Sequence, residues 1–309
     1  MTEMNMIESL NSALDNMLEE HDNVVIFGED VGYFGGVFRV TDGLQAKHGA
    51  HRVFDAPLAE GGIAAIAFGM GLNGLRPVAE IQFADYIFPA YDQIVNEIAK
   101  LRHRSGGEFT TPVTIRTPAG GGIKGGHHHS QSPESQFTHT PGLKVVYCSN
   151  PNNAKGLLTS AIECNDPVIF FEPKRCYRGP FYGDPHNVPT WKGHAKAEVP
   201  EGHYSIPMEQ AEVVMEGDAC TVIAWGAMVH VAEQGIKNSG INAELIDLRT
   251  LLPWDRDTVV NSVKKTGRCV IVHEAPKTSG FGAEMSASIQ ERCFWHLESP
   301  IIRATGWDT

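Results

Sequence analysis

Apolar residues recur at two different spacings along the chain, and each spacing predicts a different element of secondary structure. Near the start they fall three or four positions apart, at Ile7, Leu10, Leu14 and Leu18, which predicts a helix with one apolar face. The run 24–27 is instead continuously apolar, as in strands that are buried on both faces of a parallel sheet. The chain is therefore expected to begin with a helix that leads into a buried strand.

The alternation of strand and helix patterns continues through the first half of the chain. Further apolar runs predict strands at 52–54, 78–81, 113–116, 144–147 and 168–171. Helical patterns separate these runs at 61–74, 84–102 and 152–164. Such alternation is typical of a doubly wound α/β domain, in which helices cover a mostly parallel sheet.

A segment without periodicity divides the chain. Residues 173–207 are rich in Pro, Gly, His and charged residues, which indicates a linker. Beyond it the patterns predict strands at 220–224, 244–248, 269–273 and 301–302 and helices at 228–238, 255–265 and 282–296. We therefore predict two α/β domains, at 1–180 and 208–309, joined by a linker at 181–207. A length of 309 residues is sufficient for two hydrophobic cores.

Composition excludes several classes of partner. A net charge of -12 opposes binding to the phosphate backbone of nucleic acids, and no apolar run is long enough to cross a bilayer. The six cysteines are scattered without Cys-x-x-Cys spacing, which fits a reducing compartment. The first residues lead directly into the helix pattern without a signal segment. We expect the cytoplasm of a bacterium, or the mitochondrial matrix for a processed organellar chain.

Acidic residues stand where predicted strands end. Glu29 and Asp30 follow the first buried strand, and Glu60 follows Pro57-Leu58-Ala59 at a turn from strand to helix. A carboxylate at the start of a helix is also stabilised by the helix dipole, so position alone explains Glu60 without catalysis. The helix pattern after Glu60 is rich in Gly and Ala, which permits the close approach of another backbone or subunit.

Segment 82–86 mixes polar and aromatic residues at the end of another predicted strand. Gln82, Asp85 and Tyr86 could contact a ligand. The alternative is that Asp85 caps a helix while Phe83 and Tyr86 pack in the core.

A glycine-rich segment at 119–126 leads into three consecutive histidines, His127, His128 and His129. It matches neither the phosphate-binding P-loop nor the dinucleotide fingerprint. Adjacent side chains point in different directions, so the three histidines suit one zinc ion poorly, although a zinc enzyme remains an alternative. One of them is better interpreted as a group that transfers protons, because histidine titrates near neutral pH.

Taken together, the motifs resemble the β subunit of the decarboxylating component of branched-chain 2-oxo acid dehydrogenase complexes. The segments that carry the resemblance are Gly28–Val31, Phe34–Arg39, Pro57–Glu60, Glu80–Tyr86, Asp92–Gln93, His129–Glu134, Ile246–Thr250 and His273–Ala275. They span nearly the whole chain. Two features are unusual for this family, namely His127 with His128, and an end at Thr309, which leads us to expect a shortened second domain.

The resemblance implies a transketolase-like α/β fold, with a doubly wound pyrimidine-binding domain followed by a smaller C-terminal domain. It implies oxidative decarboxylation of acids such as 3-methyl-2-oxobutanoate by thiamine diphosphate, with acyl transfer to lipoamide. An α subunit would supply the diphosphate and magnesium site within an α2β2 heterotetramer, which would dock on a lipoyl-bearing acyltransferase core. The chain indeed lacks the Gly-Asp-Gly segment that is typical of the magnesium site.

The resemblance also assigns roles to residues. Glu60 would hydrogen-bond the aminopyrimidine ring and promote removal of the thiazolium C2 proton, and His129 would assist acyl transfer to lipoamide. The cofactor's pyrimidine side would be lined by Glu29, Leu58, Gln82 and Tyr86. A structural potassium ion would be held, largely by carbonyl groups, at Val113, Thr114, Ala161, Cys164 and Asp166.

Two other hypotheses remain open. A pyruvate or acetoin dehydrogenase β subunit would have the same fold and a different substrate. A non-catalytic scaffold would use the small-residue helix at 61–74 for packing against a partner. The presence of both Glu60 and His129 in matching segments favours catalysis.

Overall fold

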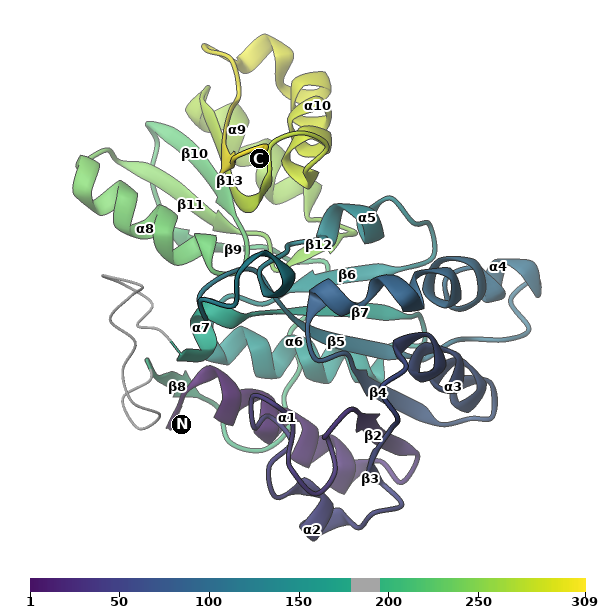
Figure 1. Ribbon diagram of the computed structural model, residues 1–309. Helices are drawn as coiled ribbons and strands as arrows, with labels where there is room; N and C mark the ends of the chain where they lie inside the picture. Colours follow the sequence, from purple (N-terminus) through teal and green to yellow (C-terminus); the bar gives the residue numbers. More distant parts are fainter. Residues whose placement is uncertain (179–194) are drawn as a thin grey trace.

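The computed structural model describes residues 1–178 and 195–309, which form two sheets covered by helices (Figure 1). Much of the predicted linker at 181–207, up to residue 194, lies outside the described residues. The first sheet has seven strands in the order β12-β6-β7-β5-β4-β2-β3. Their bounds are β2 Val24–Gly28, β3 Val53–Asp55, β4 Arg76–Glu80, β5 Thr114–Ala119, β6 Lys144–Tyr147, β7 Val168–Pro173 and β12 Thr250–Leu252. All of its pairings are parallel except that of β12 with β6.

The second sheet has five strands in the order β14-β13-β10-β11-β9, of which only β9 pairs antiparallel. Their bounds are β9 Glu212–Met215, β10 Cys220–Ala224, β11 Ala243–Asp247, β13 Cys269–Pro276 and β14 Ile302–Gly306. A short antiparallel pair joins β1 (Thr2–Met4) to β8 (Ala197–Val199). The predicted strands in both halves are therefore confirmed, whereas β1, β8, β9 and β12 were missed.

Helices cover both faces of each sheet (Figure 1). The first half contains α1 Met6–Glu20, α2 Leu44–His48, α3 Glu60–Leu72, α4 Leu101–Arg104, α5 Glu134–Thr138, α6 Pro151–Glu163 and α7 Lys174–Arg178. The second half contains α8 Met228–Ser239, α9 Arg256–Thr266 and α10 Phe281–Cys293. Helices α1 and α6 pack together on one face of the first sheet, and α3 lies on the other. In the second half, α8 covers one face while α9 and α10 cover the opposite one.

Local sequence explains why these helices begin where they do. The side chain of Asn5 accepts a hydrogen bond from the backbone nitrogen of Glu8, and the side chain of Glu8 accepts one from the backbone nitrogen of Asn5. This capping box starts α1. The apolar face predicted from Ile7, Leu10 and Leu14 is buried. Asn150 caps α6 in the same way, followed by a proline in the first turn.

The predicted helix at 84–102 is wrong as a single element. The segment forms two short 3-10 turns, Ala84–Tyr86 and Phe88–Ala90, a π-helical stretch Gln93–Ile98 and then α4. Pro89 cannot donate a backbone hydrogen bond, so a regular helix cannot run through this position. The interruption keeps residues 82–86 next to the end of β4 instead of carrying them along a helix.

The two halves of the chain are joined by a shared sheet edge and by buried hydrogen bonds. Strand β12, from the second half, completes the edge of the first sheet by pairing with β6. The indole nitrogen of Trp225 donates to Glu134 over 3.2 Å, and Nδ2 of Asn153 donates to Asp247 over 3.0 Å. All four of these side chains are buried, so the junction is a packed interface. No helix in the described ranges is long and apolar enough to span a membrane.

Glu134 should make stability depend on pH. Burial raises the pKa of its carboxyl from 4.5 to about 7, so the fold disfavours the ionised form. The loss of unfolding free energy caused by ionisation of Glu134 grows as the pH rises from 4.5, and it is complete above pH 7. We expect Glu134→Gln to raise the free energy of unfolding at pH 8 by up to about 3 kcal/mol. The variant should therefore unfold at a higher urea concentration than the parent. The difference should vanish near pH 4.5.

The matched control is Glu291→Gln, on the exposed side of α10, which should behave as the parent at every pH. Equal unfolding midpoints for Glu134→Gln and the parent at pH 8 would contradict the prediction.

Candidate active site

Three glutamates gather where parallel strands of the first sheet end. Glu29 follows β2, Glu80 ends β4, and Glu60 is the first residue of α3. In parallel sheets this carboxyl edge is the usual place for ligands, because strand ends and helix starts converge there. Glu29 and Glu80 are buried and Glu60 is half-buried. The structure thus brings together three acidic groups that are far apart in the sequence.

The environment of Glu29 favours a proton on its carboxyl. Burial raises the pKa of Glu29, and the nearby charges of Glu60, Asp30 and Glu80 raise it further. Its Oε1 atom is buried and has no hydrogen-bond partner among the described residues. A buried acceptor of this kind is costly unless a ligand or a proton satisfies it. Glu29 therefore marks a position where a hydrogen-bonding group is expected.

A buried arginine holds the strand ends behind these carboxylates. Arg116 donates to both oxygens of Glu172, over 2.8 and 2.7 Å, and also to Glu80. Tyr177 donates its hydroxyl to Glu172 as well. Burial opposes the charge of Arg116, but the two carboxylates outweigh burial and raise the pKa of the guanidinium. The network joins β4, β5 and β7 at the edge that carries the glutamates.

Segment 82–86 connects the glutamates to the predicted catalytic histidine. Gln82 donates from Nε2 to Asp30 Oδ2 over 3.0 Å, beside Glu29. Tyr86 Oη lies 2.7 Å from His129 Nε2, and His129 Nδ1 lies 3.0 Å from the carbonyl oxygen of Gly125. A carbonyl can only accept, so Nδ1 carries a proton, whereas Nε2 and the tyrosine hydroxyl can each donate or accept. The two hydrogen bonds therefore fix the orientation of the imidazole ring.

The other predicted site residues lie on the surface. Leu58 is 81% exposed, so its side chain is largely accessible to solvent in this chain. His127 and His128 are exposed, with ring centres 3.9 Å apart. The described ranges contain no group of three His, Cys, Asp or Glu residues that could hold a metal ion.

An arginine side chain lies beside Cys164, one of the five residues predicted to hold potassium. Arg76, at the start of β4, donates from one guanidinium nitrogen to the carbonyl oxygens of Ile162, Glu163 and Cys164 over 3.0 to 3.1 Å. Its other terminal nitrogen donates to Asn165 Oδ1 over 2.7 Å. These carbonyls end α6, where a positive charge is favourable.

The remaining candidates are bonded elsewhere. The carbonyl of Val113 accepts from Val168 N, and that of Ala161 accepts from Cys164 N. Asp166 pairs with Arg102, and Thr114 begins β5. Of the five predicted residues, Cys164 thus has a positive charge supplied by the guanidinium of Arg76, and we expect the fold not to need potassium there.

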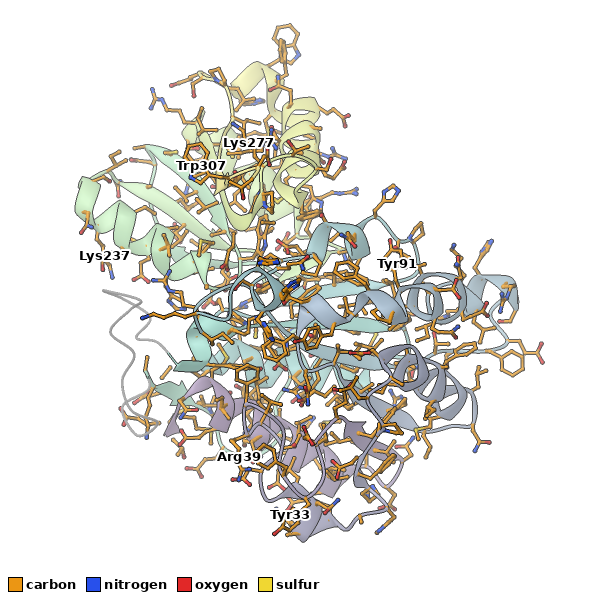
Figure 2. All side chains as sticks on the ribbon, in the orientation of Figure 1. Tyr33, Arg39, Tyr91, Lys237, Lys277 and Trp307 are labelled. Carbon is orange, nitrogen blue, oxygen red and sulfur yellow. The ribbon has the colours of Figure 1, made fainter. Side chains whose placement is uncertain are left out.

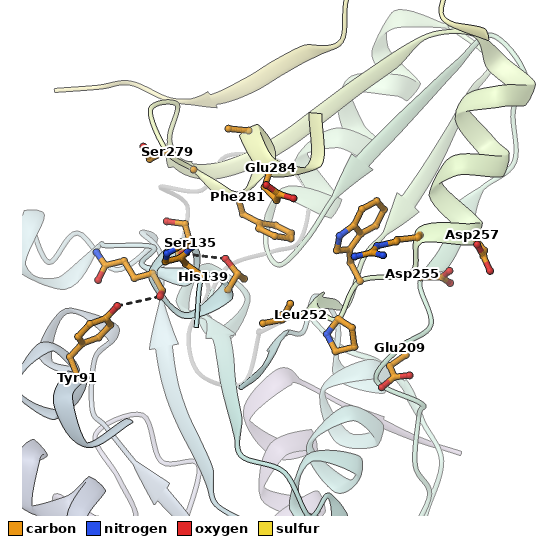
Figure 3. Close-up of a pocket in the computed structure, with 17 residues that line it drawn as sticks. Tyr91, Ser135, His139, Glu209, Leu252, Asp255, Asp257, Ser279, Phe281 and Glu284 are labelled. Carbon is orange, nitrogen blue, oxygen red and sulfur yellow. Dashed lines mark hydrogen bonds between the residues drawn. The ribbon is translucent and has the colours of Figure 1, made fainter. Parts of the chain in front are cut away.

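A large cavity lies away from these groups (Figure 3). It has a volume of about 1130 Å³ and lies between the two halves, with Tyr91, Leu252, Phe281 and Glu284 in its wall. A smaller cavity of about 580 Å³ is lined by Ser130, Gln131 and Glu274. Neither includes Glu29 or Glu60. The glutamates instead lie beside open surface, since Leu58 next to Glu60 is exposed.

Sequence reasoning missed three charged residues of this region. Arg116 and Lys174 are buried, and Glu274 accepts a backbone hydrogen bond from Gly121 over 2.7 Å. A signal was present, because Arg116 interrupts an apolar strand run and Lys174 directly follows one. Charged residues are almost never fully buried unless they are paired, so such positions indicate a specific contact.

Comparisons with known proteins show which family the sequence matches. Residues 2–180 match the family described as "Transketolase, pyrimidine binding domain", and residues 209–309 match "Transketolase, C-terminal domain". The chain is similar over its whole length to the 2-oxoisovalerate dehydrogenase subunit beta of Pseudomonas aeruginosa, with 58% identity, covering 88% of that protein. The mitochondrial subunit of the same name from Dictyostelium discoideum is 56% identical over 99% of this chain and 80% of its own length.

Two further similarities define the limits of this evidence. The pyruvate dehydrogenase E1 component subunit beta of Acholeplasma laidlawii is 47% identical over 98% of this chain and 89% of its own length. A solved structure described as a split gene transketolase, inactive beta4 tetramer, superposes with a TM-score of 0.74 at 21% identity. The superposition covers 98% of this chain and 90% of the transketolase chain, and it is evidence for the fold alone.

The role of Arg76 can be tested by unfolding. We expect Arg76→Ala to lose about 2 kcal/mol of unfolding free energy, because several carbonyls lose their donor. The parent should melt at the same temperature in potassium chloride as in choline chloride of equal ionic strength. Arg104→Ala, which removes an exposed pair with Glu97, is the control and should change little. A parent chain that melts several degrees lower without potassium would refute this interpretation.

Proposed function

The chain belongs to the family of 2-oxoisovalerate dehydrogenase β subunits, and on that basis we propose that it is the β half of a thiamine-diphosphate-dependent enzyme. The reaction is the oxidative decarboxylation of branched 2-oxo acids such as 3-methyl-2-oxobutanoate, with acyl transfer to lipoamide. Its full-length similarity to two subunits of this name is the observation that carries the proposal.

The residues at the carboxyl edge fit the pyrimidine half of the cofactor. Glu60 has no hydrogen-bond partner among the described residues, and Glu29 presents a buried acceptor without a donor. Carboxyl groups suit an aminopyrimidine, which offers both a ring nitrogen and an amino group. Glu60 would bond the ring nitrogen, while Glu29, Leu58, Gln82 and Tyr86 would line this side. When bound, the cofactor supplies a nucleophilic carbon and an electron sink for decarboxylation.

The chain's own task in decarboxylation is proton control at Glu60. A carboxyl group at this position can share a proton with the ring nitrogen and so promote proton removal elsewhere on the cofactor. The neighbouring charge of Glu29 couples to that of Glu60. Burial and the charge of Glu60 both raise the pKa of Glu29, so Glu29 retains its proton more readily than a free glutamate does.

The chain's task in acyl transfer is proton control at His129. Its Nδ1 atom faces the carbonyl of Gly125, so Nε2, beside Tyr86, is the ring position that can take up a proton and return it. When lipoamide receives the acyl group, one sulfur is acylated and the other gains a proton. His129 would stabilise or protonate the sulfur that leaves the disulfide.

A partner subunit would complete the site. Exposed apolar side chains occur in the segments after β2 and β3 and on α3, namely Tyr33 at 93%, Leu58 at 81% and Ile66 at 45%. Tyr33 projects at the end of the molecule formed by α2 and β3 (Figure 2). On the basis of family resemblance, we assign magnesium and the diphosphate to an α subunit. An α2β2 heterotetramer and its docking on a lipoyl-bearing core rest on family resemblance.

The family includes bacterial and mitochondrial members. The proposed location accordingly remains a bacterial cytoplasm, or a mitochondrial matrix for an organellar chain. The competing substrate is pyruvate, which the similarity to a pyruvate dehydrogenase subunit supports.

Substrate preference and the need for a partner can be measured together. The chain should release carbon dioxide only when it is assembled with its α subunit, thiamine diphosphate and magnesium. We expect kcat/KM for 3-methyl-2-oxobutanoate to exceed that for pyruvate by at least about tenfold. A preference for pyruvate would overturn the substrate, and activity of the isolated chain would overturn the shared site.

Glu60→Gln tests the proton relay. The amide cannot share a proton with the ring nitrogen, so decarboxylation should fall by about 10²- to 10⁴-fold in an intact assembly. Glu284→Gln is the matched control, because Glu284 is exposed and lines the larger cavity. If the glutamine at position 60 leaves turnover unchanged, or if the Glu284 variant loses it, the proposed site is wrong.

A further inference from the structure

We propose that Asp85, Lys174 and Glu274 form a clamp that holds the His129 loop, residues 119–132, in the position needed for acyl transfer. The three residues are named together as the clamp from here on. The inference rests on the proposed function for the role of His129, but the contacts that define the clamp are independent of it.

The His129 loop has little structure of its own. It is closed at its base by a hydrogen bond from Gly120 N to the carbonyl of Gln131, over 2.9 Å. Between these points only the short turn His127–His129 is regular. Gly120, Gly122 and Gly126 adopt positive φ angles. A loop so rich in glycine loses much conformational entropy when it is ordered, so contacts from outside must hold it.

Two carboxylates hold the base of the loop. Asp85 Oδ1 accepts from the backbone nitrogens of Ser130 and Gln131, over 3.2 and 3.1 Å, directly after His129. Glu274 Oε1 accepts from Gly121 N over 2.7 Å, on the other arm of the base. A Cβ atom at Gly120 would stand 2.5 Å from Glu274 Oε2, so this approach requires glycine. The two carboxylates come from different halves of the chain.

Lys174 provides a positive charge beside Asp85, and its charge also acts on Glu274 together with that of Arg175. Its ammonium lies 3.8 Å from Asp85 Oδ2 and donates to the carbonyl of Pro118 over 3.3 Å. Its side chain is fully buried, and that of Asp85 is only 2% exposed. Burial lowers the pKa of Lys174 to about 8, while the charges of Asp85 and Glu274 oppose this effect. Buried charges of this kind are tolerated because oppositely charged groups attract one another.

The clamp also contacts the histidine ring indirectly. The ammonium of Lys174 lies 5.3 Å from the centre of the Phe83 ring, which packs edge-on against His129 at 4.7 Å. The imidazole is thus held by Phe83, Tyr86 and Gly125, while the clamp holds the backbone around it. Misplacement of a proton-transfer group by about 1 Å can cost roughly 10²-fold in rate.

The experiment uses the chain assembled with its α subunit and the variants Lys174→Met, Asp85→Asn and Glu274→Gln. Decarboxylation is followed with dichlorophenolindophenol as electron acceptor, and acyl transfer is followed with a lipoyl substrate. We expect acyl transfer to fall by about 10- to 100-fold while decarboxylation stays within about threefold. Lys174→Arg should recover part of the loss, and Lys47→Met, on an exposed ion pair, should match the parent.

Hydrogen exchange supplies a readout that needs no activity. Peptides spanning 119–132 should exchange faster in the three clamp variants. An amide oxygen accepts from Gly121, Ser130 and Gln131 more weakly than a carboxylate does, and Lys174→Met removes the cation beside Asp85. If Lys174→Met does not assemble, the nearly isosteric Asp85→Asn and Glu274→Gln decide the question.

Three results would overturn the clamp: unchanged exchange, unchanged acyl transfer, or equal losses in both reactions. A parent assembly that decarboxylates no 2-oxo acid refutes the proposed function and, with it, the assignment to acyl transfer.

Discussion

Arg116 donates to Glu80 and Glu172 from the centre of the first sheet, and the arrangement of the carboxyl edge depends on this contact. All three side chains are almost completely buried. Removing the guanidinium would leave two carboxylates in a region that water does not reach, at a cost of about 3 to 5 kcal/mol. The pairs fix β4 and β7 relative to β5, and the segments that follow these strands carry Gln82, Tyr86 and Lys174. One cation inside the sheet therefore sets the distances among groups on its surface.

The same edge combines charges that would repel one another in isolation. Glu29, Glu60 and Glu80 make the local electrostatic potential more negative. The positive charge of buried Arg116 compensates for this only in part. A site of this charge suits a ligand that brings hydrogen-bond donors. It also explains why Glu29 holds a proton more readily than an exposed glutamate does.

Much of the architecture could be predicted from the sequence, because buried parallel strands produce continuous apolar runs. The missed strands are short, and β12 pairs with β6, which lies about a hundred residues earlier in the sequence. No local pattern reports such a pairing. The glutamates could be placed at strand ends in advance, but their clustering depends on strand order, which periodicity does not contain. The contacts of Arg76, Lys174 and Glu274 are long-range, and for these the residue types alone gave only a weak signal. The roles of Glu60 and His129 came from resemblance and remain proposals.

Strand β12 has a wider consequence for how the protein can move. Because a strand of the second half is hydrogen-bonded into the first sheet, the halves cannot swing apart as rigid bodies without breaking that edge. Hinge opening, the common way for a two-domain enzyme to admit substrate, is thereby closed to this chain. Any motion that admits a ligand must therefore be smaller than a separation of the two halves.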